Sequence, residues 1–230
     1  MTFDILNEYG IEHSFLGLPN DYSERKYDNE NIYYLRQNHT NKVVTIEEND
    51  KVDDPKFLDV DGVLTNLKGK TLVIRTADCQ SIFLYDPIKK VIGNVHSGWR
   101  GTLDTIILNA VNLMVERYNS NKEDIICCFN PSILGCHFEI GDDVYTLFKD
   151  KFNYIDEFLC DKKIVNDENK YYLDLLNFNI DLLKKNGIKN IYASDICTFC
   201  DTNCHSYRRD KTKKRNGSFI TLWGKYEKKK

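Results

Sequence analysis

The chain has 230 residues, 41% of them hydrophobic and 29% charged, the composition of a globular protein long enough for one large domain or two small ones. Its four prolines and 12 glycines exclude a collagen-like or low-complexity protein, and its longest uncharged stretch, the 14 residues Ile125–Phe138, is too short to cross a membrane. The formal net charge is −3, and the C-terminal segment Arg208–Lys230 is basic. We favour a solvated tail at Lys228–Lys230 over nucleic-acid binding, because no stripe of basic and aromatic residues precedes it.

The N-terminal residues Met1–Ile5 do not combine a basic region with an apolar run, so we expect no secretory signal and a cytoplasmic location. In that compartment the eight cysteines are expected to be thiols that fill the core, bind metals or act as nucleophiles. No repeat or linker-like stretch divides the chain, so we expect a single domain over residues 1–230.

Apolar, β-branched runs of strand length recur along the chain, each bounded by Gly, Asp, Asn or Pro. Strands are therefore predicted, in chain order, at Lys42–Ile46, Val60–Thr65, Thr71–Arg75, Ser81–Tyr85, Val91–Val95, Ile125–Phe129 and Ile188–Ala193. Two segments repeat apolar residues at the helical period, Leu103–Tyr118 and Asp174–Asn186. Strands mixed with helices and joined by short connections predict an α/β sandwich with a mixed sheet.

Reactive side chains gather where two of these strands end. Asp78 and Cys79 follow one strand, and His96 follows another. We expect the functional site here, because α/β proteins usually bind ligands beyond the ends of their strands.

The residues after His96 have the character of an anion site. Gly98 allows close approach of the backbone, and the helix that follows offers N–H groups without partners. Arg100 adds a planar guanidinium suited to phosphate, although a purely structural role for Arg100 explains it equally well.

His39, Cys79 and His96 all lie at the ends of apolar runs. Two imidazoles and one thiolate leave a fourth tetrahedral position open, as in catalytic zinc sites. Spacings of 40 and 17 residues form no local metal motif, so the residues by themselves also allow ordinary core or surface side chains.

Cys197 and Cys200 form a Cys-x-x-Cys pair, which is half of a structural zinc knuckle or a redox pair. No second pair lies at the spacing of a zinc ribbon or finger, so the residues do not favour a second metal site. The adjacent Cys127 and Cys128 lie in an apolar run, where core filling is the expected role.

Five motifs follow one another along nearly the whole chain: Gln37–Val43, Thr76–Cys79, His96–Thr102, Asn130–Gly141, and Cys197–Cys200 with Ser206–Asp210. In this order they resemble the motifs of the YfiH-type laccase-domain family. That family was once labelled polyphenol oxidase and is now described as purine nucleoside phosphorylase with adenosine deaminase activity. The chain departs from the family pattern at Thr40, Ser97, Asn130 and His137.

The resemblance implies an α/β/α sandwich and a zinc ion held by His39, Cys79 and His96, with copper as the alternative metal. It implies phosphorolysis of adenosine, inosine and S-methyl-5′-thioadenosine, and hydrolytic deamination of adenosine. The expected partners are therefore purine nucleosides and phosphate, bound by a monomer or a homodimer. We expect His137 to line the pocket or to replace a purine contact.

These reactions suggest roles for individual residues. Zinc would make a water nucleophilic near pH 7 for attack at the purine C6, and Asp78 is the candidate that moves the proton or orients a metal ligand. Gly98 with Arg100, or Arg208 and Arg209, would hold phosphate against C1′ of the ribose.

Three other functions remain open. A metal-independent hydrolase would use Cys79 as nucleophile and His96 as its base. A copper-dependent phenol oxidase is disfavoured because a blue-copper site usually adds an axial Met, and the chain has only Met1 and Met114. A zinc-stabilised binding module would bind nucleosides without turnover.

Overall fold

The computed structural model describes residues 1–24, 29–165 and 168–223, and its centre is a six-stranded mixed sheet in the order β12-β8-β6-β7-β4-β3. The four inner strands are antiparallel, whereas the outer strands β12 and β3 run parallel to their neighbours. β6 and β7 are buried along their whole length, because both faces of the sheet are covered. The strands are β3 (Val43–Thr45), β4 (Gly62–Thr65), β6 (Gln80–Asp86), β7 (Val91–Ser97), β8 (Ile126–Phe129) and β12 (Asn190–Ala193).

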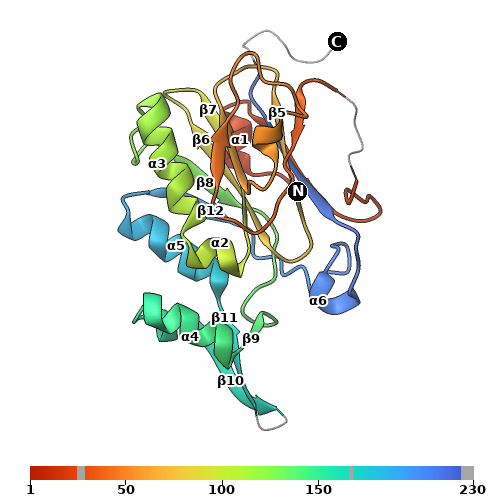
Figure 1. The fold of residues 1–230 in the computed structure, drawn as a ribbon, viewed down its shortest axis with the longest axis vertical. Coiled ribbons are helices and arrows are strands. Elements are labelled where there is room, and N and C mark those ends of the chain that lie inside the picture. Colours follow the sequence, from red (N-terminus) through yellow and green to blue (C-terminus); the bar gives the residue numbers. More distant parts are fainter. Residues whose placement is uncertain (25–28, 166–167, 224–230) are drawn as a thin grey trace.

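Helices α3 (Ile106–Tyr118) and α5 (Leu175–Lys185) cover one face of this sheet (Figure 1). Their apolar side chains form one buried cluster with strand residues such as Ile82 and Phe129. A short helix, α2 (Trp99–Leu103), precedes α3, and Thr105 separates the two in the left-handed conformation with φ 54°. The helix predicted to start at Leu103 therefore starts at Ile106, because the chain turns at Thr105.

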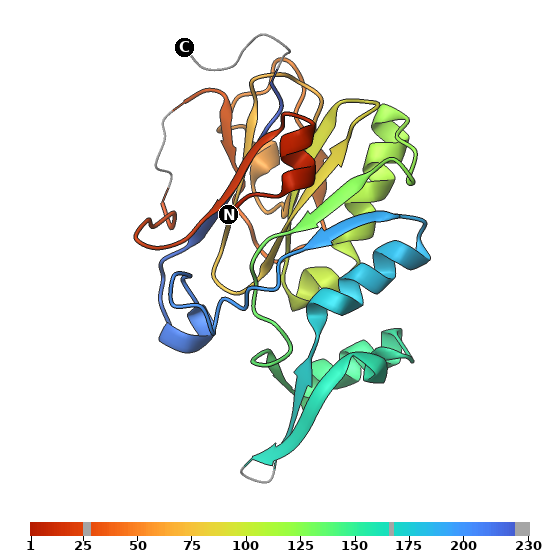
Figure 2. The same cartoon turned by 180° about the vertical axis from the view of Figure 1, so that it is seen from behind.

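A four-stranded sheet and helix α1 (Asp4–Glu8) cover the opposite face (Figure 2). Side chains of this sheet, such as Leu72 and Ile220, form a second buried cluster with Phe83 and Tyr85 of the central sheet. The strand order is β1-β13-β5-β2, with β1 (Glu12–Leu16), β2 (Ile32–Tyr34), β5 (Thr71–Thr76) and β13 (Asn216–Thr221).

A third, antiparallel sheet and helix α4 extend below the central layers in Figure 1. Phe178 of α5 lies among aromatic rings from this part, including Phe148 and Phe158, and so joins it to the rest of the core. The remaining elements are β9 (Glu139–Gly141), α4 (Asp142–Lys151), β10 (Leu159–Val165), β11 (Glu168–Leu173), α6 (Tyr207–Asp210) and the 3-10 turns Pro55–Phe57 and Ile155–Phe158.

The mixed α/β fold with mixed sheets is confirmed, and each of the predicted strands and helices overlaps an observed one. Helices lie on both sides of the central sheet, but the four-stranded sheet supplies much of the layer beside α1. No helix in the described part of the chain is long and apolar enough to cross a membrane. The basic tail Lys228–Lys230 lies outside the described residues.

Candidate metal centre and adjoining cavity

Three potential metal ligands that are distant in the sequence meet where β7 ends and β6 begins. His39 lies in the loop before β3, Cys79 directly precedes β6, and His96 is the last residue but one of β7. Their ligand atoms lie within 4.8 Å of one another. Two imidazoles and a thiol form the donor set of a zinc site with an open fourth position, so these residues fit the metal that the resemblance implies.

The buried carboxylate of Asp61 orients both histidine ligands. Asp61 Oδ1 lies 2.7 Å from Nδ1 of His96 and accepts the backbone N–H of His39 at 3.1 Å. Asp61 Oδ2 accepts the backbone N–H and the hydroxyl of Thr40 at 2.6 and 2.8 Å. Because Nδ1 of His96 is hydrogen-bonded to the Asp61 carboxylate, Nε2 is the ring nitrogen that remains available to bind a metal, as in carboxylate–histidine–zinc arrangements.

These contacts shift the pKa values of the site. Burial would raise the pKa of Asp61, but hydrogen bonds from His96 and Thr40 outweigh burial and lower that pKa to about 2. Burial would lower the pKa of His96, but Asp61 and the Cys79 thiol raise it to about 9. Burial lowers the pKa of His39 below its ordinary value, and the neighbouring His96 adds to this effect. Asp61 is therefore a fixed anion beneath the cluster.

Gly98 lies against the same cluster. A Cβ atom at this position would be 2.9 Å from Nδ1 of His39 and 3.1 Å from Sγ of Cys79. Such distances are too short for van der Waals contact, so only glycine leaves the two ligands in place. The sequence predicted Gly98 as a phosphate contact, and the structure shows it bordering the metal ligands.

The three ligands lie on the wall of a cavity of about 580 Å³, a volume within the usual range for small-molecule sites. Asp78, Gly98 and Arg208, all predicted site residues, also line the cavity. Basic side chains dominate the charged lining among the described residues, where Asp78 is the single carboxylate beside Arg36, Arg75, Arg208, Lys213 and Arg215. Such a cavity favours an anionic ligand.

Asp78 is buried and holds two parts of the cavity wall together. Its Oδ1 accepts the hydroxyl of Thr198 at 2.7 Å, and its Oδ2 accepts the backbone N–H of Arg208 at 2.6 Å. Its backbone is left-handed, with φ 90°. A carboxylate has about four acceptor positions, so Asp78 can still bind a substrate group or a proton.

Three other predicted residues are not among those that line the described cavity. The Arg100 guanidinium lies over the ring of Trp99, 4.2 Å from its centroid. The Arg209 guanidinium donates to four backbone carbonyls and to Asp210, which ties together residues 198–210. His137 lies beside Cys136 and Cys200.

Asp61 and most of the basic lining were not predicted from the sequence. Asp61 lies inside the predicted strand Val60–Thr65 and just before the observed β4, and only its contact with His96 reveals its role. Arg75 belongs to β5 and lines the cavity from the four-stranded sheet, while Lys213 and Arg215 line it from the basic segment after α6. The composition of a basic segment does not show whether its residues line a cavity or belong to a solvent-exposed chain end.

Residues 22–223 match the model of the family described as multi-copper polyphenol oxidoreductase laccase. The chain belongs to this laccase-domain family. It is 33% identical over 192 residues to a purine nucleoside phosphorylase of Borreliella burgdorferi, which covers 84% of this chain and 79% of that protein. It is 36% identical over 186 residues to a purine nucleoside phosphorylase of Aquifex aeolicus, covering 81% of this chain and 80% of that protein.

The fold is also that of solved family structures. The crystal structure of the hypothetical protein YfiH from Bacillus licheniformis superimposes with a TM-score of 0.76 at 28% identity, covering 86% of this chain and 76% of that one. The resemblance seen in the sequence is thus confirmed at the level of family and fold.

Proposed function

We propose that this protein is a zinc-dependent purine nucleoside phosphorylase that also deaminates adenosine. The observation that carries this proposal is the arrangement of His39, Cys79 and His96 on the wall of a basic cavity of about 580 Å³. Phosphorolysis requires an anion and a nucleoside in one cavity, and deamination requires a nucleophilic water beside it. Relatives named purine nucleoside phosphorylase support the substrate class.

The basic lining supports the phosphorolysis half of the proposal. Phosphate attacks C1′ of a ribose while positive charge develops on the sugar, so the anion has to be held close to that carbon. Arg208 is half-buried on the wall, and its backbone N–H is held by Asp78. Its guanidinium donates to the carbonyls of His137 and Glu139, which fixes the position of the charged group. A fixed guanidinium suits the planar, bidentate binding of phosphate.

The histidine–cysteine cluster supports the deamination half. Zinc, when bound, supplies a Lewis acid that makes a water nucleophilic near neutral pH. Asp78 directly precedes Cys79 and faces the same cavity, so its free acceptor positions can take the proton from that water and pass it to the leaving amino group. His96 remains oriented by Asp61 throughout.

Zinc is favoured over copper by the surroundings of the two methionines. Met114 is fully buried against the central sheet as part of α3. Neither Met1 nor Met114 is among the residues that line the described cavity, so the cluster lacks the axial thioether usual in blue-copper sites. The single thiol and two imidazoles are sufficient for zinc.

The test is the incubation of adenosine with the zinc-loaded protein, with and without phosphate, followed by chromatography. Inosine is expected in both samples, and adenine or hypoxanthine only in the sample with phosphate. The Cys79→Ala variant should lose both activities if one zinc serves both, whereas retained phosphorolysis would show that this reaction does not need the metal. Unchanged adenosine in both samples contradicts the proposal.

A metal-independent hydrolase is the second candidate, and one observation favours it. Asp61, His96 and Cys79 follow one another in contact, which is the order of acid, base and nucleophile in a cysteine hydrolase. Zinc that remains bound at stoichiometric amounts through dialysis would contradict this candidate. Activity that survives full removal of metal, together with inactivation by iodoacetamide at Cys79, would support it.

A further inference from the structure

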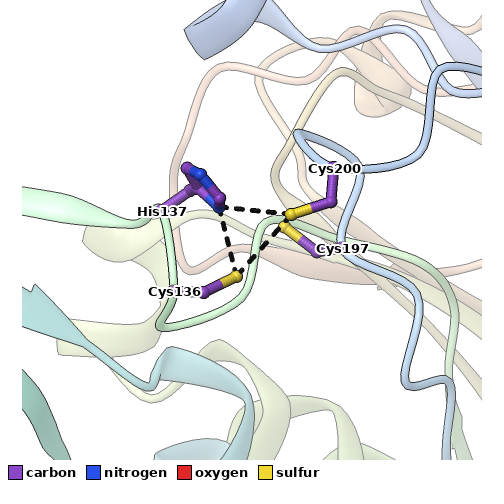
Figure 3. Close-up of side chains that lie close together, drawn as sticks. All are labelled: Cys136, His137, Cys197 and Cys200. Atoms are coloured by element: carbon purple, nitrogen blue, oxygen red, sulfur yellow. Dashed lines mark hydrogen bonds between the residues drawn. The ribbon is translucent and has the colours of Figure 1, made fainter.

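A second cluster of potential ligands lies outside the cavity. Cys136 and His137 come from the loop before β9, and Cys197 and Cys200 from the loop before α6 (Figure 3). Their ligand atoms all lie within 4.8 Å of one another. Nδ1 of His137 is 3.2 Å from Sγ of Cys136 and 3.3 Å from Sγ of Cys200, and the latter two sulfurs are 4.0 Å apart.

We propose that these four residues form a structural zinc site, separate from the site at His39, Cys79 and His96. Zinc bonds of about 2.3 Å to sulfur and 2.0–2.1 Å to nitrogen, in a tetrahedron, place two sulfurs ~3.8 Å apart and a sulfur and a nitrogen ~3.6 Å apart. The three separations among His137, Cys136 and Cys200 are within about half an ångström of these values, and Sγ of Cys197 lies within 4.8 Å of the other three atoms. Three cysteines and one histidine complete a four-coordinate shell, which is typical of structural rather than catalytic zinc.

The backbone of both loops shapes this shell. Cys197 O accepts the N–H groups of Cys200 and Asp201 at 3.1 and 2.9 Å, which closes the turn of the Cys-x-x-Cys pair. Leu134 O accepts the N–H groups of His137 and Phe138, both at 2.9 Å, which closes the opposing turn. Cys136 and His137 are adjacent in the sequence and therefore supply the second pair of ligands without a Cys-x-x-Cys motif.

Two contacts orient the ligands themselves. The backbone N–H of Leu134 lies 3.5 Å from Sγ of Cys197 and points at it, and such a donor stabilises a thiolate. The ring of His137 stacks on Phe199 at 4.0 Å between centroids and 15° between planes. This stacking keeps Nδ1 of His137 directed at the sulfurs, as the contacts around a metal ligand commonly do.

A disulfide does not account for the cluster. The 4.0 Å between the sulfurs of Cys136 and Cys200 is about twice the ~2.05 Å length of a disulfide bond, and all eight cysteines are free. A disulfide would also leave the third cysteine and His137 without a role. A metal uses all four side chains at once.

The proposed zinc would brace one wall of the cavity. Thr198, the neighbour of Cys197, donates to Asp78, and Phe138, the neighbour of His137, lines the cavity. Arg208 donates to the carbonyls of His137 and Glu139 at 3.4 and 2.9 Å. Joining the two loops through a metal therefore holds Asp78 and Arg208 in place without contact between that metal and the substrate.

The decisive experiment is the zinc content of the purified protein after dialysis, measured by elemental analysis. About two zinc ions per chain are expected in the unchanged protein. About one is expected in Cys136→Ser/Cys200→Ser, and about two in the control Cys160→Ser, which removes another exposed thiol outside the cluster. An unchanged zinc content in the double variant overturns the proposal, as does a disulfide between Cys136 and Cys200 in the unchanged protein that persists when zinc is supplied.

A second measurement does not depend on the folding of the double variant. The Cys79→Ser variant, with its first site disabled, is loaded with cobalt(II), whose thiolate charge-transfer absorption grows with the number of sulfur ligands. One equivalent with a strong, three-thiolate spectrum is expected. No thiolate band in this variant overturns the second site, whereas loss of nucleoside turnover in the same variant reports only on the first.

Discussion

Oδ1 of Asp61 lies 2.7 Å from Nδ1 of His96, and both groups are buried at the base of the candidate metal centre. This contact determines which ring nitrogen of His96 is free to bind a metal. It also places a negative charge beneath the cluster of potential ligands, which favours a divalent cation over a neutral occupant.

Asp61→Asn should therefore weaken zinc binding about 10- to 100-fold, because the amide keeps the shape of the carboxylate but loses its charge. The measurement is a competition titration with a chromophoric chelator. Asp86→Asn is the matched control, since Asp86 is equally buried and holds the backbone N–H groups of Ile88 and Lys89, away from the metal centre. Equal zinc affinity in the two variants would contradict a role for Asp61 at the metal.

Gly98→Ala should lower zinc affinity about ten- to hundredfold, because the added methyl group would displace His39 and Cys79 at a cost of about 1–3 kcal/mol. The same titration measures it. Gly141→Ala serves as control, because its Cβ comes closest to the exposed carboxylate of Asp143, which can move aside. Full zinc affinity in Gly98→Ala would show that the cluster relaxes around the methyl group.

Arg208→Gln should raise KM for phosphate about ten- to hundredfold while changing KM for the nucleoside much less. A hydrogen bond to a charged group contributes about 1.5–3 kcal/mol, and the glutamine cannot supply the charge. Steady-state kinetics with each substrate varied in turn measure the split. Arg117→Gln is the control, since Arg117 is exposed and pairs with Glu47. An equal rise in both KM values would instead indicate that Arg208 stabilises the cavity wall and does not bind phosphate specifically.

The stability of the protein should fall as pH falls below about 6.5, and His13 should account for part of that loss. His13 is buried, Nε2 accepts the N–H of Phe3 at 2.7 Å, and Nδ1 faces the carbonyl of Ile11 at 2.9 Å. Burial lowers its pKa below the ordinary 6.5, and the Ile11 carbonyl only partly opposes this. Its stabilisation is therefore present above pH 6.5 and is lost as protonation favours the unfolded chain.

Thermal unfolding of the wild type and His13→Gln between pH 5 and 8 tests this expectation. The variant should be less stable at pH 8 and should lose less stability on acidification, because glutamine does not titrate. Parallel curves for the two proteins would exclude His13 as the source of the acid sensitivity.

The strands of the central sheet could be predicted because they are buried on both faces. A continuous apolar run such as Ser81–Tyr85 is typical of a strand whose sheet is covered on both faces, and the corresponding strand β6 is buried at every position. β13 was not predicted, because its sequence is partly polar and includes Gly217, a residue that is uncommon in strands. Glycine is required there because a side chain would collide with the ring of Tyr22. In β10 the residues 160–164 are exposed, so this strand shows no apolar alternation, and β11 buries only Tyr171 and Leu173.

By itself, the sequence predicted the mixed α/β class from apolar periodicity and the family from the order of its motifs. The three ligands of the first candidate metal centre form no local motif, and only the resemblance to the family implied them. The tertiary structure alone decided that Asp61 supports His96, that Arg75 and Lys213 face the cavity, and that Cys136 and His137 complete the shell begun by Cys197 and Cys200. These relationships join residues from separate loops whose ends meet only after the sheets pack. The spacing of these residues along the chain does not predict their contacts, because the distance between two loops depends on how the intervening strands pack.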